Sequence, residues 1–128
     1  MDTNIVAYLY LESEFTSRAE ALLDSDSDWA VPLLWRSEFR NILAGAIRRK
    51  ALGFEAACQI SAEAESLLAG GEHDVGSRSI LELVRNSDCS AYDCEFAVLA
   101  AQLGVKLVTM DGKLLKAFPK LAQPLPAA

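Results

Sequence analysis

The sequence predicts an α/β fold, a three-layer α/β/α sandwich with a mostly parallel sheet. The first observation behind this prediction is that short apolar segments alternate with longer segments in which apolar residues keep helical spacing. Such alternation is typical of parallel sheets covered by helices on both faces. The second observation is that the 128 residues contain no internal repeat or low-complexity segment. We therefore expect one domain spanning residues 1–128.

The N-terminal segment predicts a short strand that ends at Asp2, followed by two short helices. Residues 3–11 and 14–23 have helical spacing, and the acidic stretch DSDSD at 24–28 is typical of a turn. The next residues, WAV at 29–31, favour a short strand. Two helices therefore separate the first two expected strands.

Two long helices are expected in the middle of the chain. Pro32 suits the first turn of a helix, and the apolar residues after it keep helical spacing to about Lys50. A second helix at 53–69 is closed by Gly70-Gly71. The apolar residues of these helices exceed what one domain edge covers, so a helical hairpin at the centre of a homodimer is expected.

The second half of the chain continues the alternation. A strand near EHDV at 72–75 precedes helices around 78–86 and 91–103. The apolar segment VKLVTM at 105–110 predicts a central strand, and a last short helix is expected around 112–117. Because sites in parallel α/β sheets gather at the carboxyl ends of strands, functional side chains are expected there.

Two acidic residues lie on apolar helix faces, where a charge is costly. Glu38 lies between Leu34 and Ile42 on one apolar stripe, and Asp93 shares its helix face with apolar side chains. Each also has an ordinary interpretation. Glu38 can reach solvent at the edge of its stripe, and Asp93 can form a capping box with Ser90.

Two further acidic residues directly follow expected strands. These are Asp2 and Asp111, although Asp111-Gly112 is also a common turn pair. With Glu38 and Asp93 they make four acids from four segments, and we expect them to converge on one crevice. Crowded carboxylates repel one another, and a hard divalent cation such as Mg²⁺ or Mn²⁺ relieves that repulsion.

This combination resembles the PIN-domain ribonucleases, in particular the small VapC-type toxins of prokaryotic toxin–antitoxin pairs. The resemblance covers essentially the whole chain. Each motif is weak alone, but their order and apolar flanks are together fairly specific. The motifs are DTN at 2–4, Glu38 within LLWRSEFRNIL, Asp93 within SAYDCEFAVLAAQLG and Asp111 within LVTMDGKLLKAFP.

The resemblance implies a parallel α/β/α sandwich with Mg²⁺- or Mn²⁺-dependent endoribonuclease activity on RNA. It also implies a homodimer that a cognate antitoxin inhibits. Asp2, Asp93 and Asp111 are then the expected metal ligands. Glu38 is expected either to bind the metal through water or to act as the base that positions the attacking water.

Four polar residues near these acids are candidate donors that orient the carboxylates. They are Thr3, Asn4, Ser90 and Thr109. Each has an equally good interpretation as an ordinary helix cap or turn residue.

The basic residues carry less information. Arg36 and Arg40 lie on the side of their helix that is opposite Glu38, and such a position is typical of a solvated face. Lys113, Lys116 and Lys120 closely follow the last acidic motif and are candidates for contacts with phosphates, with a plain surface position as the alternative.

Composition excludes several other classes of protein. No apolar segment approaches the roughly 20 residues of a membrane span, and no signal peptide is evident, so a cytoplasmic protein is expected. Cys58, Cys89 and Cys94 form no CxxC pair and are expected to be small buried residues. His73 has no cysteine pair nearby, so a surface or strand-edge position is expected for it and not a zinc site. The net charge of −6 argues against a general nucleic-acid coat protein.

Three alternatives remain open at this point. A receiver-type phosphoacceptor domain normally shows paired acids after its first strand, where MDTN has one. A hydrolase with an aspartyl nucleophile would show a DxD start. A PIN-like binding module with an impaired site is the third alternative. Only Met1 precedes Asp2, and a very short first strand would hold that carboxylate loosely.

Overall fold

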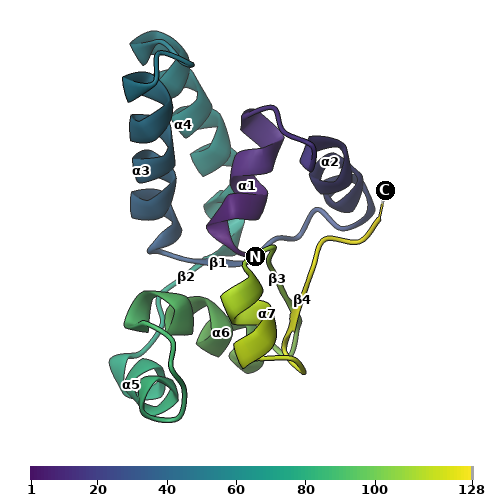
Figure 1. Cartoon of the computed structure of the whole chain (residues 1–128), viewed down its shortest axis with the longest axis vertical. Helices are drawn as coiled ribbons and strands as arrows, with labels where there is room; N and C mark the ends of the chain where they lie inside the picture. Colours follow the sequence, from purple (N-terminus) through teal and green to yellow (C-terminus); the bar gives the residue numbers. More distant parts are fainter. Residues whose placement is uncertain (128) are drawn as a thin grey trace.

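Helices surround two short pairs of parallel strands in the computed structural model, which describes residues 1–127 (Figure 1). The predicted α/β class with parallel strands is confirmed. Among the described residues, no helix is long and apolar enough to cross a membrane. The elements are α1 (Thr3–Tyr10), α2 (Thr16–Ser25), β1 (Val31–Pro32), α3 (Trp35–Arg48), α4 (Phe54–Leu68), the 3₁₀ turn η1 (Ala69–Gly71), β2 (Glu72–His73), α5 (Ser77–Arg85), α6 (Ala91–Leu103), β3 (Leu107–Val108), α7 (Gly112–Ala117) and β4 (Ala122–Gln123).

The strands pair as β1 with β2 and as β3 with β4, both in parallel. Val31 lies opposite Glu72 in the first pair, and Leu107 lies opposite Ala122 in the second. Each strand is only two residues long, so the strands position the helices but supply little of the buried surface. The helices provide most of the core.

The first two residues lie between the two strand pairs. The backbone nitrogen of Met1 donates to the carbonyl oxygen of Ala30 at 3.0 Å, just before β1. The backbone N–H of Asp2 donates to the carbonyl oxygen of Val108 in β3, also at 3.0 Å. The strand expected to end at Asp2 does not form. Instead, these two hydrogen bonds connect residues 1 and 2 to both strand pairs.

The core is built around the middle of α6, where Cys94 and residues 96–100 are buried. A helix that is apolar all round is expected at the centre of a domain, and the sequence AYDCEFAVLAAQL carries only two charges. Trp35 and Phe39 of α3 are almost completely buried, with ring centroids 5.6 Å apart. Helix α6 ends at Gly104, whose φ of 67° is left-handed and is favourable only for glycine or a few polar residues.

The structure also differs from the sequence-based predictions at β1, at β4 and at one cysteine. Pro32 belongs to β1, and α3 begins at Trp35. Proline has no N–H to donate to a neighbouring strand, and it is tolerated at the end of a short edge strand such as β1. The strand is thus shifted from the expected WAV at 29–31. A fourth strand, β4, was not expected. Cys58 is exposed on α4, whereas the other two cysteines are buried as predicted.

Candidate active site

One cavity of about 230 Å³ is lined by all four acidic residues that the sequence singles out. They reach it from four separate segments: Asp2 precedes α1, Glu38 lies in α3, Asp93 lies in the first turn of α6 and Asp111 precedes α7. The remaining lining residues are Thr3, Asn4, Asn41 and Ile42. The fold therefore gathers carboxylates that are up to 109 positions apart in the chain (2 to 111).

Asp2 is held at its backbone and at both carboxylate oxygens. It is buried, its Oδ1 accepts the N–H of Thr3 at 2.8 Å, and its Oδ2 accepts the hydroxyl of Thr109 at 2.6 Å. The expectation that a missing first strand would leave this carboxylate loose is wrong. Burial raises the pKa of Asp2, and the charge of Asp111 adds to this, while the two hydrogen bonds oppose it.

Glu38 is half-buried and is tied to the same helix start. The hydroxyl of Thr3 donates to its Oε1 at 2.7 Å. Thr3 therefore contacts two carboxylates, that of Asp2 through its N–H and that of Glu38 through its hydroxyl. Burial raises the pKa of Glu38, and the negative charges of Asp2 and Asp93 raise it further.

Asp111 caps α7 and is linked to Asp2 by a buried threonine. Its Oδ1 accepts the N–H of Lys113 at 2.9 Å, and its own N–H donates to the hydroxyl oxygen of Thr109 at 3.0 Å. Thr109 is completely buried and donates its hydroxyl proton to Asp2. One hydroxyl thus sets the spacing of two acidic residues from different ends of the chain.

Asp93 lies in the first turn of α6, which Ser90 caps by accepting the N–H of Asp93 at 3.1 Å. Burial raises the pKa of Asp93, and the charge of Asp111 adds to this, while the ammonium group of Lys113 opposes it. Ser90 itself does not line the cavity, so its contact is that of a helix cap. Asp93 does line the cavity, so its position is more than that of a capping residue.

Two polar side chains of the cavity carry uncharged amides. Asn4 was among the candidates from the sequence, and it lines the cavity from α1. Asn41 was not. It lies three residues after Glu38 in α3 and therefore on the same helix face, which is the signal that could have identified it.

The donor set fits a hard divalent cation. The cavity presents carboxylate, amide and hydroxyl oxygens, with no sulfur or imidazole. Within residues 1–127, no three His, Cys, Asp or Glu side chains are grouped tightly enough to hold one ion directly. Mg²⁺ usually keeps several of its waters and binds through one or two carboxylates. The arrangement therefore suits a partly hydrated cation.

An ion-pair network fixes the helix that carries Glu38. Arg36 donates through Nε to Glu72 of β2 at 2.6 Å and through Nη1 to Glu65 of α4 at 2.5 Å. The indole nitrogen of Trp35 donates to the same Glu72 carboxylate at 2.8 Å. The interpretation of Arg36 as a purely solvated residue is wrong, because it joins α3 to α4 and to β2.

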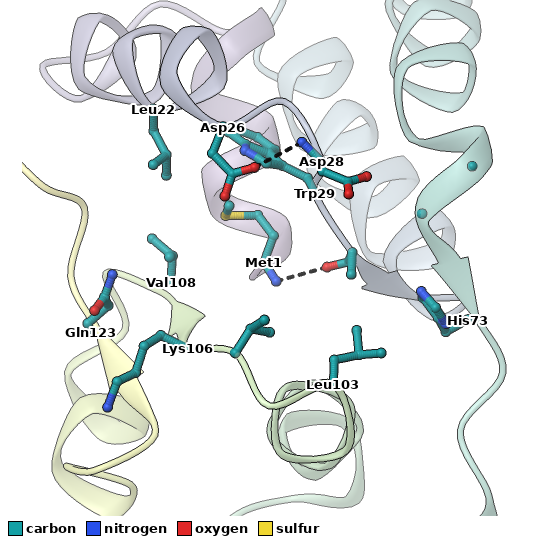
Figure 2. Close-up of a pocket in the computed structure, with 14 residues that line it drawn as sticks. Met1, Leu22, Asp26, Asp28, Trp29, His73, Leu103, Lys106, Val108 and Gln123 are labelled. Carbon is teal, nitrogen blue, oxygen red and sulfur yellow. Dashed lines mark hydrogen bonds between the residues drawn. The ribbon is translucent and has the colours of Figure 1, made fainter.

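A larger cavity of about 470 Å³ lies beside Met1 and the segments that lead into β1, β2 and β3 (Figure 2). Trp29, His73 and Lys106 are among its lining residues, and none of the four clustered acids is. His73 occupies β2, the strand position that the sequence predicts for it. Size alone would favour this cavity, but its walls lack the converging carboxylates, so the smaller cavity is the better candidate for catalysis.

Comparison with known families gives one match. The model of the PIN domain family matches residues 1–121. The matched segment includes all four acidic residues of the cavity and both threonines that contact them. No curated protein matches the chain significantly.

Proposed function

The chain belongs to the PIN domain family, whose members are generally metal-dependent nucleases, and from this we propose that it is a Mg²⁺- or Mn²⁺-dependent endoribonuclease. We further propose that it is the toxin of a type II toxin–antitoxin pair, of the VapC type, and that it acts in the cytoplasm. The observation that supports the catalytic proposal is that Asp2, Glu38, Asp93 and Asp111 line one cavity. Such a cluster is a costly arrangement without a cation.

The four carboxylates have different surroundings, which suggests different roles. A divalent cation bound among Asp2, Asp93 and Asp111, partly through its own water molecules, would polarise the phosphodiester and lower the pKa of a bound water. Glu38 has one carboxylate oxygen, Oε1, engaged by Thr3. Its other oxygen is available to accept a proton from the attacking water, and the raised pKa makes Glu38 a stronger base than an ordinary glutamate.

The two threonines would keep this arrangement in place during the reaction. Thr3 and Thr109 together contact Asp2, Glu38 and Asp111, and both threonines are buried. Fixed carboxylates cost no reorganisation when charge develops on the phosphate. No side-chain nucleophile is required by this scheme.

We propose a homodimer formed through the α3–α4 hairpin. Phe54 is 68% exposed at the start of α4, and Ile47 and Leu67 of the same hairpin are also exposed. Light scattering of the full chain should give a dimer, and Phe54→Lys should weaken it. Leu81→Lys is the matched control, because Leu81 is similarly exposed on α5 outside the hairpin. A strictly monomeric chain at high concentration would refute the dimer.

The proposed antitoxin would place a segment in the acidic cavity. Arg48 and Arg49 are exposed at the end of α3 and could seat other parts of such a partner. Co-expression with the product of the neighbouring open reading frame tests this. The expected result is a stable complex in which Mn²⁺-dependent cleavage is lost.

Cleavage of single-stranded RNA by the full chain in Mn²⁺ tests the catalytic proposal. Asp93→Asn should abolish cleavage. Asp88→Asn should not, because Asp88 is an exposed acid close to Asp93 that does not line the cavity, and the change in net charge is the same. Equal cleavage by both variants would remove Asp93 from the site. A chain that binds no Mn²⁺ and cleaves nothing would instead be a binding module.

A further inference from the structure

An RNA strand must approach a cavity that repels it. Four carboxylates line this cavity, and the whole chain carries a net charge of −6. Long-range attraction to phosphate is therefore absent, and binding must rely on local hydrogen-bond donors and cations near the cavity. Two residues beside the cavity that the proposed chemistry does not use provide such groups.

Asn41 is such a donor on the α3 side of the cavity. It is exposed, it lines the cavity one helical turn after Glu38, and its side chain makes no hydrogen bond to the described part of the chain. An amide N–H can donate to a phosphate oxygen, which the surrounding carboxylates cannot do. Asn41 thus offers an unused donor beside the expected base.

Lys113 is a cation on the α7 side of the cavity. It lies in the first turn of α7, and its backbone N–H donates to the carboxylate of Asp111. Its side chain is exposed and forms no ion pair within residues 1–127. Its ammonium group lies close enough to Asp93 to lower the pKa of that carboxyl. A free cation beside two of the expected metal ligands can pair with a phosphate that neighbours the scissile one.

We infer that a single RNA strand crosses the cavity from α3 to α7, with the Asn41 amide donating to one phosphate and the Lys113 ammonium group pairing with another. This inference rests on the proposed function, since it gives that site its substrate contacts. Neither residue acts on the reacting atoms. Both hold the strand so that the phosphodiester between the two contacts faces the carboxylates.

Fluorescence anisotropy with a 5′-fluorescein-labelled single-stranded RNA oligonucleotide tests this path. The full chain is titrated in Ca²⁺ at several salt concentrations, and the same samples are checked for cleavage. Asn41→Ala and Lys113→Ala should each weaken binding about tenfold, as expected for loss of one charge-assisted hydrogen bond. Lys113→Arg should retain binding. Asn86→Ala and Lys106→Ala, exposed residues outside the acidic cavity, should leave binding unchanged.

The salt dependence separates the two contacts. For single strands, each neutralised phosphate contributes about 0.7 to the slope of log K against log salt. Lys113→Ala should reduce the slope by about that amount, whereas Asn41→Ala should leave it unchanged because an amide carries no charge. A general structural defect in the two variants would not reduce the salt slope of Lys113→Ala while leaving that of Asn41→Ala unchanged.

Three outcomes decide the matter. RNA affinity that is unchanged in both variants would overturn the inference, even if the unaltered chain cleaves RNA. An unaltered chain that does not bind the oligonucleotide would overturn it as well. Binding that depends on Asn41 and Lys113, without cleavage when Mn²⁺ replaces Ca²⁺, would support the strand path and contradict the nuclease proposal alone.

Discussion

The hydroxyl of Thr109 donates to the Oδ2 atom of Asp2 at 2.6 Å, across 107 positions of the chain. The same hydroxyl oxygen accepts the backbone N–H of Asp111 at 3.0 Å. Thr109 is completely buried, so water cannot replace either bond. This residue therefore couples the start of α1 to the start of α7 and fixes the distance between two expected metal ligands.

Replacing Thr109 by Val should weaken metal binding while keeping the shape of the side chain. The change leaves the Asp2 carboxylate and the Asp111 N–H without a partner, which should cost about 1–3 kcal/mol of the free energy of unfolding. Loss of an orienting hydrogen bond should also lower Mn²⁺ affinity by roughly 10–100-fold. Isothermal titration with Mn²⁺ and chemical denaturation measure the two effects. Thr109→Ser should restore the Mn²⁺ affinity, and failure to do so would show that the methyl group matters and the hydroxyl does not.

Mn²⁺ should raise the melting temperature of the unaltered chain. Binding to the folded state alone contributes about 2.7 kcal/mol at a hundredfold excess over Kd, which corresponds to roughly 10 °C for a domain of this size. Asp93→Asn should abolish the rise, and the control Asp88→Asn should preserve it. Differential scanning fluorimetry provides the measurement. A rise of the same size in Asp93→Asn would contradict the assignment of Asp93 as a ligand.

The affinity for Mn²⁺ should fall as the pH falls. Burial raises the pKa of Asp2, Glu38 and Asp93, and mutual repulsion adds to this, so protons compete with the cation above the ordinary carboxyl range. In the metal-free protein the folded state binds these protons more tightly than the unfolded state. Its stability should therefore fall as the pH rises from the ordinary carboxyl pKa through the raised values.

Asp93→Asn removes one of these groups and supplies the check. In EDTA, the variant should gain stability relative to the unaltered chain as the pH rises through this window, and the two should converge at lower pH. Denaturation at several pH values measures the difference. A difference that does not change with pH would mean that the carboxyl at position 93 is not perturbed by its neighbours.

The Arg36–Glu72 pair should make an opposite, acid-sensitive contribution. The hydrogen bonds that Arg36 donates hold the pKa of Glu72 below its usual range. The pair therefore stabilises the folded state fully above the ordinary carboxyl pKa. This stabilisation should be lost as the pH falls through the lowered pKa. Glu72→Gln should therefore lower the melting temperature at neutral pH and have little effect in strong acid. Glu82→Gln, in the exposed pair with Arg78, is the control and should change little at either pH.

The helices could be predicted from the sequence more fully than the strands. Caps mark the ends of α6 and α7, since Ser90 and Asp111 begin them and Gly104 ends α6. The strands have two residues each, and alternation of apolar residues cannot be recognised over two positions. β4 therefore leaves no recognisable pattern in the sequence, and Pro32 fits the start of a helix as well as the end of a strand.

The acidic residues could be predicted from their order and their apolar flanks, and Thr3 and Thr109 could be named as candidate donors to them. A charge on an apolar helix face or at a strand end is visible in the sequence. Arg36 looked solvated because its partners Glu65 and Glu72 are 29 and 36 positions away. Asn41 was missed because an exposed asparagine on a helix breaks no pattern. The sequence marks Thr109 as a candidate donor, but the carboxylate that it contacts is determined by the fold, because Asp2 lies 107 positions away.

Mn²⁺-dependent cleavage of single-stranded RNA by Asp2→Ala, measured beside Asp93→Ala and Asp111→Ala, tests most directly whether the clustered carboxylates form one catalytic site. All three variants should lose at least about a hundredfold in cleavage rate while remaining folded, because each carboxylate is expected to hold the cation. Far-UV circular dichroism checks the fold. Cleavage by Asp2→Ala at the rate of the unaltered chain, with loss of cleavage in the other two variants, would contradict the account.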